Sequence, residues 1–279
     1  MTQIPFTDFG GTGTVLHFSH ANGFHPKSYT KLLMPFTENY RVIGIHHRPF
    51  WEKSEMDSVK NWHDFADDQI RFLEQQKATK VIGIGHSLGA SVTLLSAIKR
   101  PDLYEKLVLI EPVLLPRFIF WFIDFLPFSL KKKLSPPAKI SIKRTDTWDN
   151  RQAAYHYLRP KRVFSKIPDP IFRDFLGAAL KENDAKQAVL SFSKEWETHI
   201  YASVTNLWHL LPKVSQPTLA IRGDTTDTIT LSSWQKWQNM QPKSTTFKNI
   251  SQYGHLIPLE ASDLLSGFIE EFLGDGVIS

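Results

Sequence analysis

The chain has 279 residues, 42% of them hydrophobic, and a formal net charge of +5 at pH 7. A chain of this length can bury a substantial core and is most simply one domain that carries a large insertion. Its basic residues are scattered apart from the run at 131–133, which argues against nucleic acid as a partner. The absence of cysteine excludes disulfides, thiolate metal sites and a cysteine nucleophile.

The first predicted elements are strands and loops. Residues 1–8 lack the basic and apolar stretches of a cleaved secretion signal, so we expect a cytoplasmic protein. The first clear strand is at 14–19, and any hairpin on its N-terminal side must be short. The next buried strand, at 41–45, leads to His47 and Trp51, which we expect to border a pocket.

The following elements indicate the fold class. Residues 62–73 place apolar side chains at helical spacing, and residues 90–98 also read as a helix. Residues 81–84 and 107–110 are apolar strands. Strands that alternate with helices in this way predict an α/β protein with a mostly parallel central sheet covered by helices.

The bend after the strand at 81–84 has the sequence Gly85-His86-Ser87-Leu88-Gly89. A strand-to-helix bend of the form G-x-S-x-G is a nucleophile elbow, which exposes the serine hydroxyl at the carboxyl edge of the sheet. Both glycines are expected because a Cβ at either position would collide across the tight turn. Ser87 is therefore the predicted nucleophile, and His86, which points the other way, is expected to be structural.

The alternation of strands and helices stops between residues 113 and 212. We interpret residues 113–212 as a helical cap inserted into a core formed by residues 1–112 and 213–279. Aromatic residues are frequent in this segment, and prolines punctuate it.

The cap opens with an apolar run at 118–128. Charged residues and prolines in and around this run make a membrane span improbable. Two interpretations of the run stay open: a helix packed over the sheet, or a lid that also contacts lipid transiently or lines an acyl pocket. Phe118, Trp121 and Phe122 are candidate pocket residues.

A serine nucleophile needs a base within hydrogen-bond reach and a third group that orients the base. His255 follows the last predicted strand and is the expected base. Asp227 follows the strand at 218–221 and is the expected acid; Asp224 in the same loop and Glu111 at the end of the strand at 107–110 are its alternatives. Loops at the carboxyl ends of parallel strands meet at one edge, and the order serine, acid, histidine is typical of this architecture.

Two backbone N–H groups are expected to hold the oxyanion of the tetrahedral intermediate. Leu88 begins the helix after the nucleophile and supplies one of them. The other is expected from Asn22 in the loop after the first strand, with Phe24 as the reserve and as a candidate pocket residue. The histidines at 17, 20, 46 and 47 lack a third ligand at a recognisable spacing, so no metal is predicted. The glycines at 83, 85 and 89 do not have the spacing of a dinucleotide-binding loop, and no organic cofactor is predicted.

These motifs resemble those of the α/β-hydrolase superfamily, in its lid-bearing branch of esterases, lipases and C–C bond hydrolases. The resemblance covers the sheet domain at both ends and leaves the cap unmatched. It implies an α/β-hydrolase fold and the following roles: Ser87 as nucleophile, Asp227 as acid, His255 as base, and Asn22 and Leu88 as oxyanion donors. The resemblance rests on residues 20–24, 85–89, 222–227 and 254–255. Ala21 departs from the glycine that is usual in the family, and the N-terminal edge of the sheet is abbreviated. A serine nucleophile separates the chain from epoxide hydrolases and haloalkane dehalogenases, which use aspartate.

We therefore expect a serine hydrolase that cleaves an ester or related acyl bond of a hydrophobic small molecule through an acyl-serine intermediate. One alternative is a ligand sensor with slow or vestigial hydrolysis. Other activities of the same superfamily are also open, namely C–C bond hydrolase, thioesterase, peptidase and cofactor-free haloperoxidase. The sequence makes no prediction of oligomeric state.

Overall fold

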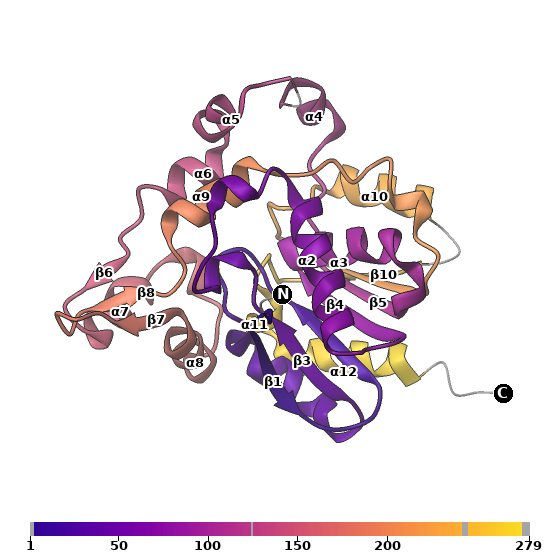
Figure 1. The fold of residues 1–279 in the computed structure, drawn as a ribbon, viewed down its shortest axis with the longest axis horizontal. Helices are drawn as coiled ribbons and strands as arrows, with labels where there is room; N and C mark the ends of the chain where they lie inside the picture. Colours follow the sequence, from indigo (N-terminus) through magenta and orange to yellow (C-terminus); the bar gives the residue numbers. More distant parts are fainter. Residues whose placement is uncertain (1–2, 124, 242–244, 275–279) are drawn as a thin grey trace.

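The computed structural model describes residues 3–123, 125–241 and 245–274 (Figure 1). Its centre is a seven-stranded sheet in the order β1-β3-β2-β4-β5-β9-β10. β1 is antiparallel to β3, and each other neighbouring pair of this sheet is parallel, which confirms the predicted mostly parallel sheet. The strands are β1 (Phe6–Gly10), β2 (Val15–Ser19), β3 (Arg41–Ile45), β4 (Val81–His86), β5 (Tyr104–Ile110), β9 (Thr218–Gly223) and β10 (Thr245–Ile250).

The N-terminal edge of the sheet is as short as the sequence predicts. β1 has five residues and pairs with β3, with Phe6 opposite Ile45. β2 follows β1 in the chain but lies on the other side of β3, so the two strands form no hairpin. A bulge between Asp8 and Gly10 interrupts the pairing near the end of β1.

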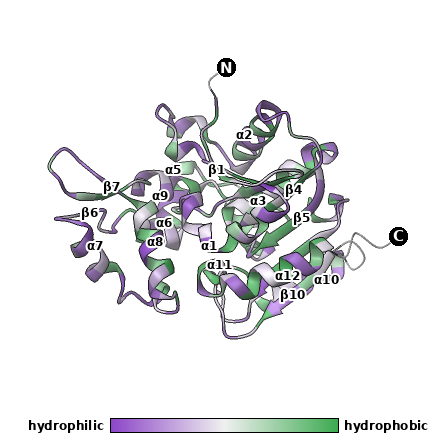
Figure 2. Cartoon of the chain, turned by 90° about the horizontal axis from the view of Figure 1, so that it is seen from below, coloured by the Kyte–Doolittle hydropathy of each residue, from purple (hydrophilic) through white to green (hydrophobic). Residues whose placement is uncertain are grey.

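The strands alternate their side chains between two apolar layers, because successive residues of a strand point to opposite faces. Val81 and Leu107 pack with α2, α3 and α10, whereas Ile82 and Val108 pack with α1, α11 and α12. Figure 2 shows β4 and β5 in green between helices that mix green and purple. These helices are α1 (Thr30–Leu33), α2 (Trp62–Gln75), α3 (Leu88–Lys99), α10 (Leu231–Met240), α11 (Ile257–Glu260) and α12 (Ser262–Gly274).

The segment expected to form an inserted cap, residues 113–212, follows β5 and precedes β9, and we call it the cap segment. It projects from the central sheet on the left and at the top of Figure 1. Its helices are α4 (Arg117–Ile123), α5 (Phe128–Leu134), α6 (Pro136–Ser141), α7 (Arg151–Leu158), α8 (Asp169–Ala179) and α9 (Lys194–Ala202).

The cap segment is not purely helical, which corrects the sequence prediction. It contains a small antiparallel sheet in the order β6-β8-β7, formed by β6 (Thr147–Trp148), β8 (Ala188–Leu190) and β7 (Leu180–Glu182). Strands of two or three residues are too short to show the alternation by which a strand is recognised in a sequence.

Short 3-10 helices connect several elements, at Pro26–Tyr29, Met34–Glu38, Arg48–Phe50, Met56–Ser58, Pro101–Leu103, Arg162–Phe164 and Leu211–Lys213. Within the described residues, no helix combines the length and the apolar character needed to cross a bilayer.

Candidate active site

Ser87 lies on the bend between β4 and α3, as the sequence predicts. Its φ is +56° and its ψ is −115°, a conformation that residues other than glycine rarely adopt. A Cβ at Gly85 would collide with the backbone of Gly89, and one at Gly89 would collide with the backbone of Ser19. The two glycines therefore allow the bend, which holds the serine at the carboxyl edge of the sheet.

His255 lies in the loop after β10, next to Ser87. Its Nε2 is 3.0 Å from Ser87 Oγ, which is hydrogen-bonding distance. The structure thus brings together a serine and a histidine that are 168 residues apart in the chain. The imidazole can accept the hydroxyl proton, as a general base must.

Glu111, rather than the expected Asp227, lies against the other nitrogen of the imidazole. Glu111 Oε2 is 3.2 Å from His255 Nδ1, and the carboxylate is fully buried. It accepts hydrogen bonds from the Gly223 N–H and the Thr226 hydroxyl, each at 2.6 Å. These two donors fix the carboxylate in place, where its oxygen can accept from an N–H at His255 Nδ1 while Nε2 faces the serine.

The two aspartates of the β9–α10 loop lie elsewhere. Asp227 is exposed, and no hydrogen bond joins it to His255 among the described residues. Asp224 is also exposed and accepts a hydrogen bond from the Gln252 N–H at 2.7 Å. The prediction of Asp227 as the acid is therefore corrected to Glu111, one of its two alternatives. The physical reason is that β5 lies between β4 and β9, so the residue after β5 reaches the imidazole from within the sheet.

The two expected oxyanion donors come from the start of α3 and from the loop after β2. Leu88 is the first residue of α3, and an N–H at the start of a helix has no partner within that helix. Asn22 lies in the loop after β2, where its side chain donates to the Glu197 carbonyl at 3.1 Å. The Phe24 N–H already donates to the Ala21 carbonyl at 3.2 Å. Of the two candidates in this loop, the contacts favour Asn22.

Comparison with known proteins identifies the family of the chain. A sequence model described as "Alpha/beta hydrolase family" matches residues 23–266, most of the chain. The protein belongs to the alpha/beta hydrolase family. Its membership confirms the fold expected from the resemblance and makes the protein a hydrolase.

Individual relatives of this hydrolase are distant. The uncharacterized hydrolase YugF of Bacillus subtilis is 22% identical over 248 residues, which cover 88% of this chain and 85% of that protein. A Haemophilus influenzae protein provisionally named an esterase/lipase is 26% identical over 239 residues, 85% of this chain and 75% of that protein. The crystal structure of E-2-(acetamidomethylene)succinate hydrolase is 18% identical, with a TM-score of 0.79, and covers 96% of this chain and 94% of its own.

The buried side chain of His86 connects His255 to the loop after β2, which fits the structural role expected for it. Its Nε2 donates to the His255 carbonyl at 2.8 Å, and its Nδ1 accepts from the Tyr29 hydroxyl at 2.8 Å. The Tyr29 oxygen in turn lies 3.4 Å from the Ala21 N–H. Burial lowers the pKa of His86 well below its usual value, so the ring stays neutral and keeps this tautomer. Sequence reasoning missed Tyr29, which no motif marks.

Further histidines are buried beside the site and are neutral. Burial, together with the neighbouring His47, lowers the pKa of His17 to about 3, and burial lowers the pKa of His47 to about 3. The pKa of His20 is also lowered well below its usual value, mainly by burial. His20 Nε2 accepts from the His47 N–H at 3.1 Å, so these rings hold the loops after β2 and β3 together. Among the described residues, no three His, Asp or Glu side chains are grouped as a metal site would require.

The candidate pocket residues of the sheet body differ in their placement. Phe24 is half-buried and packs against Tyr29 and Phe175. His47 is buried and hydrogen-bonds to Ser19 Oγ at 3.2 Å. Trp51 donates to the His46 carbonyl at 2.7 Å, and its ring is flanked by two arginines. His47 and Trp51 thus stabilise the loop after β3.

The candidate pocket residues of α4 point outward. Phe118, Trp121 and Phe122 are 65%, 71% and 60% exposed, whereas Phe120 between them is only 2% exposed. A helix has 3.6 residues per turn, so burying Phe120 turns Phe118 and Phe122 to the opposite side. The expectation that these three aromatic residues line a pocket is therefore not met.

Helix α9 of the cap segment lies against the loop after β2. Besides the bond from Asn22, a Cβ at Gly23 would lie 3.4 Å from the Glu197 carboxyl carbon. Burial raises the pKa of Glu197, and its ion pair with Arg144 opposes this shift. The cap segment thus holds one of the expected oxyanion donors in place.

Proposed function

We propose that this hydrolase cleaves an ester or related acyl bond of a hydrophobic small molecule through an acyl-Ser87 intermediate. The observation that carries the proposal is the hydrogen-bonded chain from Ser87 Oγ to His255 Nε2 at 3.0 Å and from His255 Nδ1 to Glu111 Oε2 at 3.2 Å. Such a chain makes a hydroxyl nucleophilic at neutral pH, which an isolated serine is not.

In the acylation step, Ser87 Oγ attacks the carbonyl carbon while His255 Nε2 takes the hydroxyl proton. Glu111 stabilises the imidazolium that forms, and the Leu88 and Asn22 N–H groups hold the negative oxygen of the tetrahedral intermediate. The intermediate collapses when the bond to the leaving group breaks. His255 then gives its proton to the departing alcohol.

In the deacylation step, a water molecule replaces the alcohol. His255 Nε2 takes one proton of the water as its oxygen attacks the acyl carbon of acyl-Ser87. The bond to Ser87 breaks, the serine recovers its proton from His255, and the carboxylic acid leaves. This cycle uses groups of the chain and water alone.

The choice of an ester rests on the similarity to the relative provisionally named an esterase/lipase. Other similar proteins carry the names of an acyl-CoA thioesterase and a succinate-derivative hydrolase, so the bond that is cleaved needs a direct test. The hydrophobic character of the substrate is proposed from the apolar run of the sequence at 118–128. The aromatic side chains of α4 point outward, so the series of acyl lengths below tests this part of the proposal.

Multiple-turnover hydrolysis of p-nitrophenyl esters of increasing acyl length, with a thioester and an anilide for comparison, tests the proposal. We expect turnover of esters that Ser87→Ala lowers by at least ~10^4-fold, because the hydroxyl is the nucleophile. Ser129→Ala, at an exposed position of α5, is the matched control and should keep full activity. A single burst without further turnover would favour a ligand sensor, and ester hydrolysis that survives Ser87→Ala would refute the proposal.

A further inference from the structure

The first helix of the cap segment, α4, and Phe125 just after it expose aromatic side chains. Phe118, Trp121, Phe122 and Phe125 are 65%, 71%, 60% and 83% exposed, and we call them the aromatic face. Contiguous exposed apolar groups of this kind mark interaction sites on soluble proteins. α4 and α5 project from one end of the molecule, where a flat partner can reach them (Figure 1).

The net charge of the chain is concentrated beside the aromatic face. Residues 117–143 contain six of the 33 Lys and Arg residues and one of the 28 Asp and Glu residues, which leaves 27 of each sign elsewhere. The rest of the chain is therefore neutral overall, and the whole formal charge of +5 belongs to this segment. We call residues 117–143 the basic segment.

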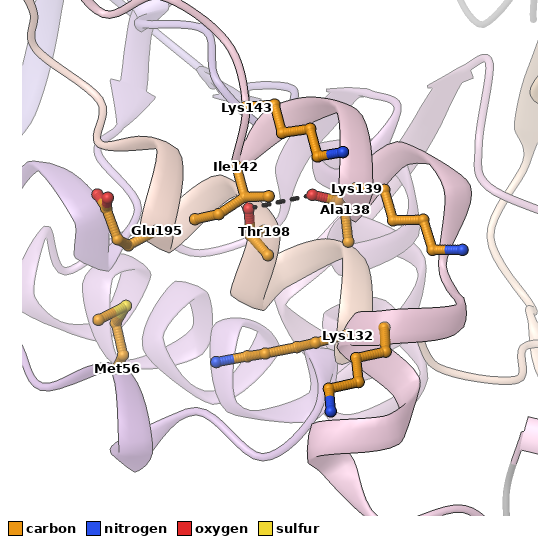
Figure 3. Close-up of a pocket in the computed structure, with 9 residues that line it drawn as sticks. Met56, Lys132, Ala138, Lys139, Ile142, Lys143, Glu195 and Thr198 are labelled. Carbon is orange, nitrogen blue, oxygen red and sulfur yellow. Dashed lines mark hydrogen bonds between the residues drawn. The ribbon is translucent and has the colours of Figure 1, made fainter.

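Several of these lysines surround a groove of about 490 Å³ between α5, α6 and α9 (Figure 3). Lys132, Lys139 and Lys143 lie around it, together with the apolar side chains of Ala138 and Ile142. Glu195 is the acidic residue that lines the groove. Ile140, at the end of α6, is 73% exposed and extends the apolar surface.

We propose that the basic segment docks on the surface of an anionic lipid bilayer. The aromatic face enters the headgroup region, where tryptophan and phenylalanine side chains are favourable, and the lysines contact lipid phosphates. Aromatic residues gather on α4 and at Phe125, whereas the lysines follow on α5 and α6. A bilayer offers an apolar interior beneath a charged surface, so it matches both groups at once.

The positive charge of the basic segment and the apolar character of the aromatic face argue against two other partners, a second copy of this chain and a soluble polyanion. Two copies of this chain that paired through the basic segment would bring two patches of like charge together. A soluble polyanion would bind the lysines but would leave the aromatic face in water. The proposal does not depend on ester hydrolysis, because docking needs no reaction at Ser87.

Vesicle co-sedimentation tests the proposal, with vesicles of phosphatidylcholine alone and of phosphatidylcholine mixed with phosphatidylglycerol. We expect binding to the mixed vesicles that weakens as salt is added, because salt screens the lysine contacts. Trp121→Ser with Phe125→Ser, and separately Lys133→Glu with Lys139→Glu and Lys143→Glu, should each lower the partition coefficient by at least ~10-fold.

A control variant carries the same charge change elsewhere, at the exposed residues Lys77→Glu, Lys181→Glu and Lys213→Glu. It should bind more tightly than the variant of the basic segment, and Ser87→Ala should bind like the unaltered protein. Absence of binding to mixed vesicles would overturn the proposal. An equal loss of vesicle binding in the control variant would overturn it too. So would dimerisation that depends on Trp121 and Phe125 in a protein that does not bind vesicles.

Discussion

The sheet body, residues 3–112, 213–241 and 245–274, and the exposed face of α4 place their aromatic side chains in opposite environments. Trp62, Phe65 and Trp237 of the sheet body are 2% exposed or less. Phe118 and Trp121 of α4 are at least 65% exposed. In the sheet body, aromatic residues stabilise the layers that hold the candidate active site. On α4 they are available to a partner, so the same residue type serves stability in one region and contact in the other.

Two kinds of consequence follow from this comparison. Changes in the sheet body should affect catalysis and folding, because the hydrogen-bonded chain from Ser87 to Glu111 is built into buried strands. Changes at the exposed positions of α4 should leave both almost unchanged. The following variants test this division, beginning with the largest expected effect.

Glu111→Gln should lower kcat by about 10^3- to 10^4-fold, because a neutral amide does not stabilise the imidazolium of His255. Asp227→Asn, the matched change in the neighbouring loop, should alter kcat by less than ~3-fold, since Asp227 is exposed. Steady-state kinetics on a p-nitrophenyl ester, with circular dichroism to verify folding, measures both. A large decrease of kcat in Asp227→Asn together with full activity in Glu111→Gln would show that Asp227 is the acid.

Acid should destabilise the sheet body through its buried histidines. Burial lowers the pKa of His17 and His47 to about 3 and that of His20 and His86 in the same direction. Below pH 6.5 these rings bind protons only in the unfolded chain, so the free energy of unfolding falls as the pH decreases. At pH 5.5 the loss should be roughly 1 kcal/mol for each histidine, relative to pH 7.5.

Urea denaturation at the two pH values measures this loss. His17→Leu offers a matched test, because the His17 ring packs against Phe72 and neither of its nitrogens has a hydrogen-bond partner among the described residues. This variant should lose roughly 1 kcal/mol of the pH dependence, which is the share of one histidine. An unchanged pH dependence in His17→Leu would contradict the assigned neutral state of His17.

Phe120→Ala should lower the free energy of unfolding by about 3 kcal/mol, because it leaves a cavity where α4 packs onto the rest of the protein. Phe122→Ala, two residues along the same helix, should change it by less than ~0.5 kcal/mol. Thermal and urea denaturation of the two variants give the comparison within a single helix. Equal losses would mean that the exposed aromatic residues of α4 also stabilise the fold.

Tyr29→Phe should lower kcat by about 10-fold and stability by about 1–2 kcal/mol. The change removes the hydroxyl between His86 Nδ1 and the Ala21 N–H, and with it the connection between the base and the loop that carries Asn22. Tyr155→Phe, which removes a hydrogen bond to Asp169 at the surface of the cap segment, is the control. A KM effect with unchanged kcat would show that Tyr29 does not position the catalytic groups.

The sequence predicted the parts of the site that depend on local pattern. The elbow at Ser87 was recognisable because its glycines and flanking elements form a short motif. The acid was not, because three carboxylates follow strands that end at the same edge of the sheet. The folded structure distinguishes them: Glu111 is fully buried and lies against His255 Nδ1, whereas Asp224 and Asp227 are exposed.

The sequence also does not predict which face of α4 is buried. Residues 118–123 are apolar without interruption, so they show no periodicity that would separate a buried face from an exposed one. The structure buries Phe120 and leaves its neighbours outside. The short strands of the cap segment were likewise missed, since pairing with a distant segment determines them.

The position of Glu111 restricts how the cap segment can be replaced by protein engineering. Glu111 lies two residues before the first residue of the cap segment, and Pro112 lies between them. A foreign lid grafted onto this scaffold must therefore be spliced beyond Pro112, with the positive φ of +52° at Glu111 preserved. An aspartate of the β9–α10 loop in this place would have left the splice point of a lid independent of the group that contacts His255.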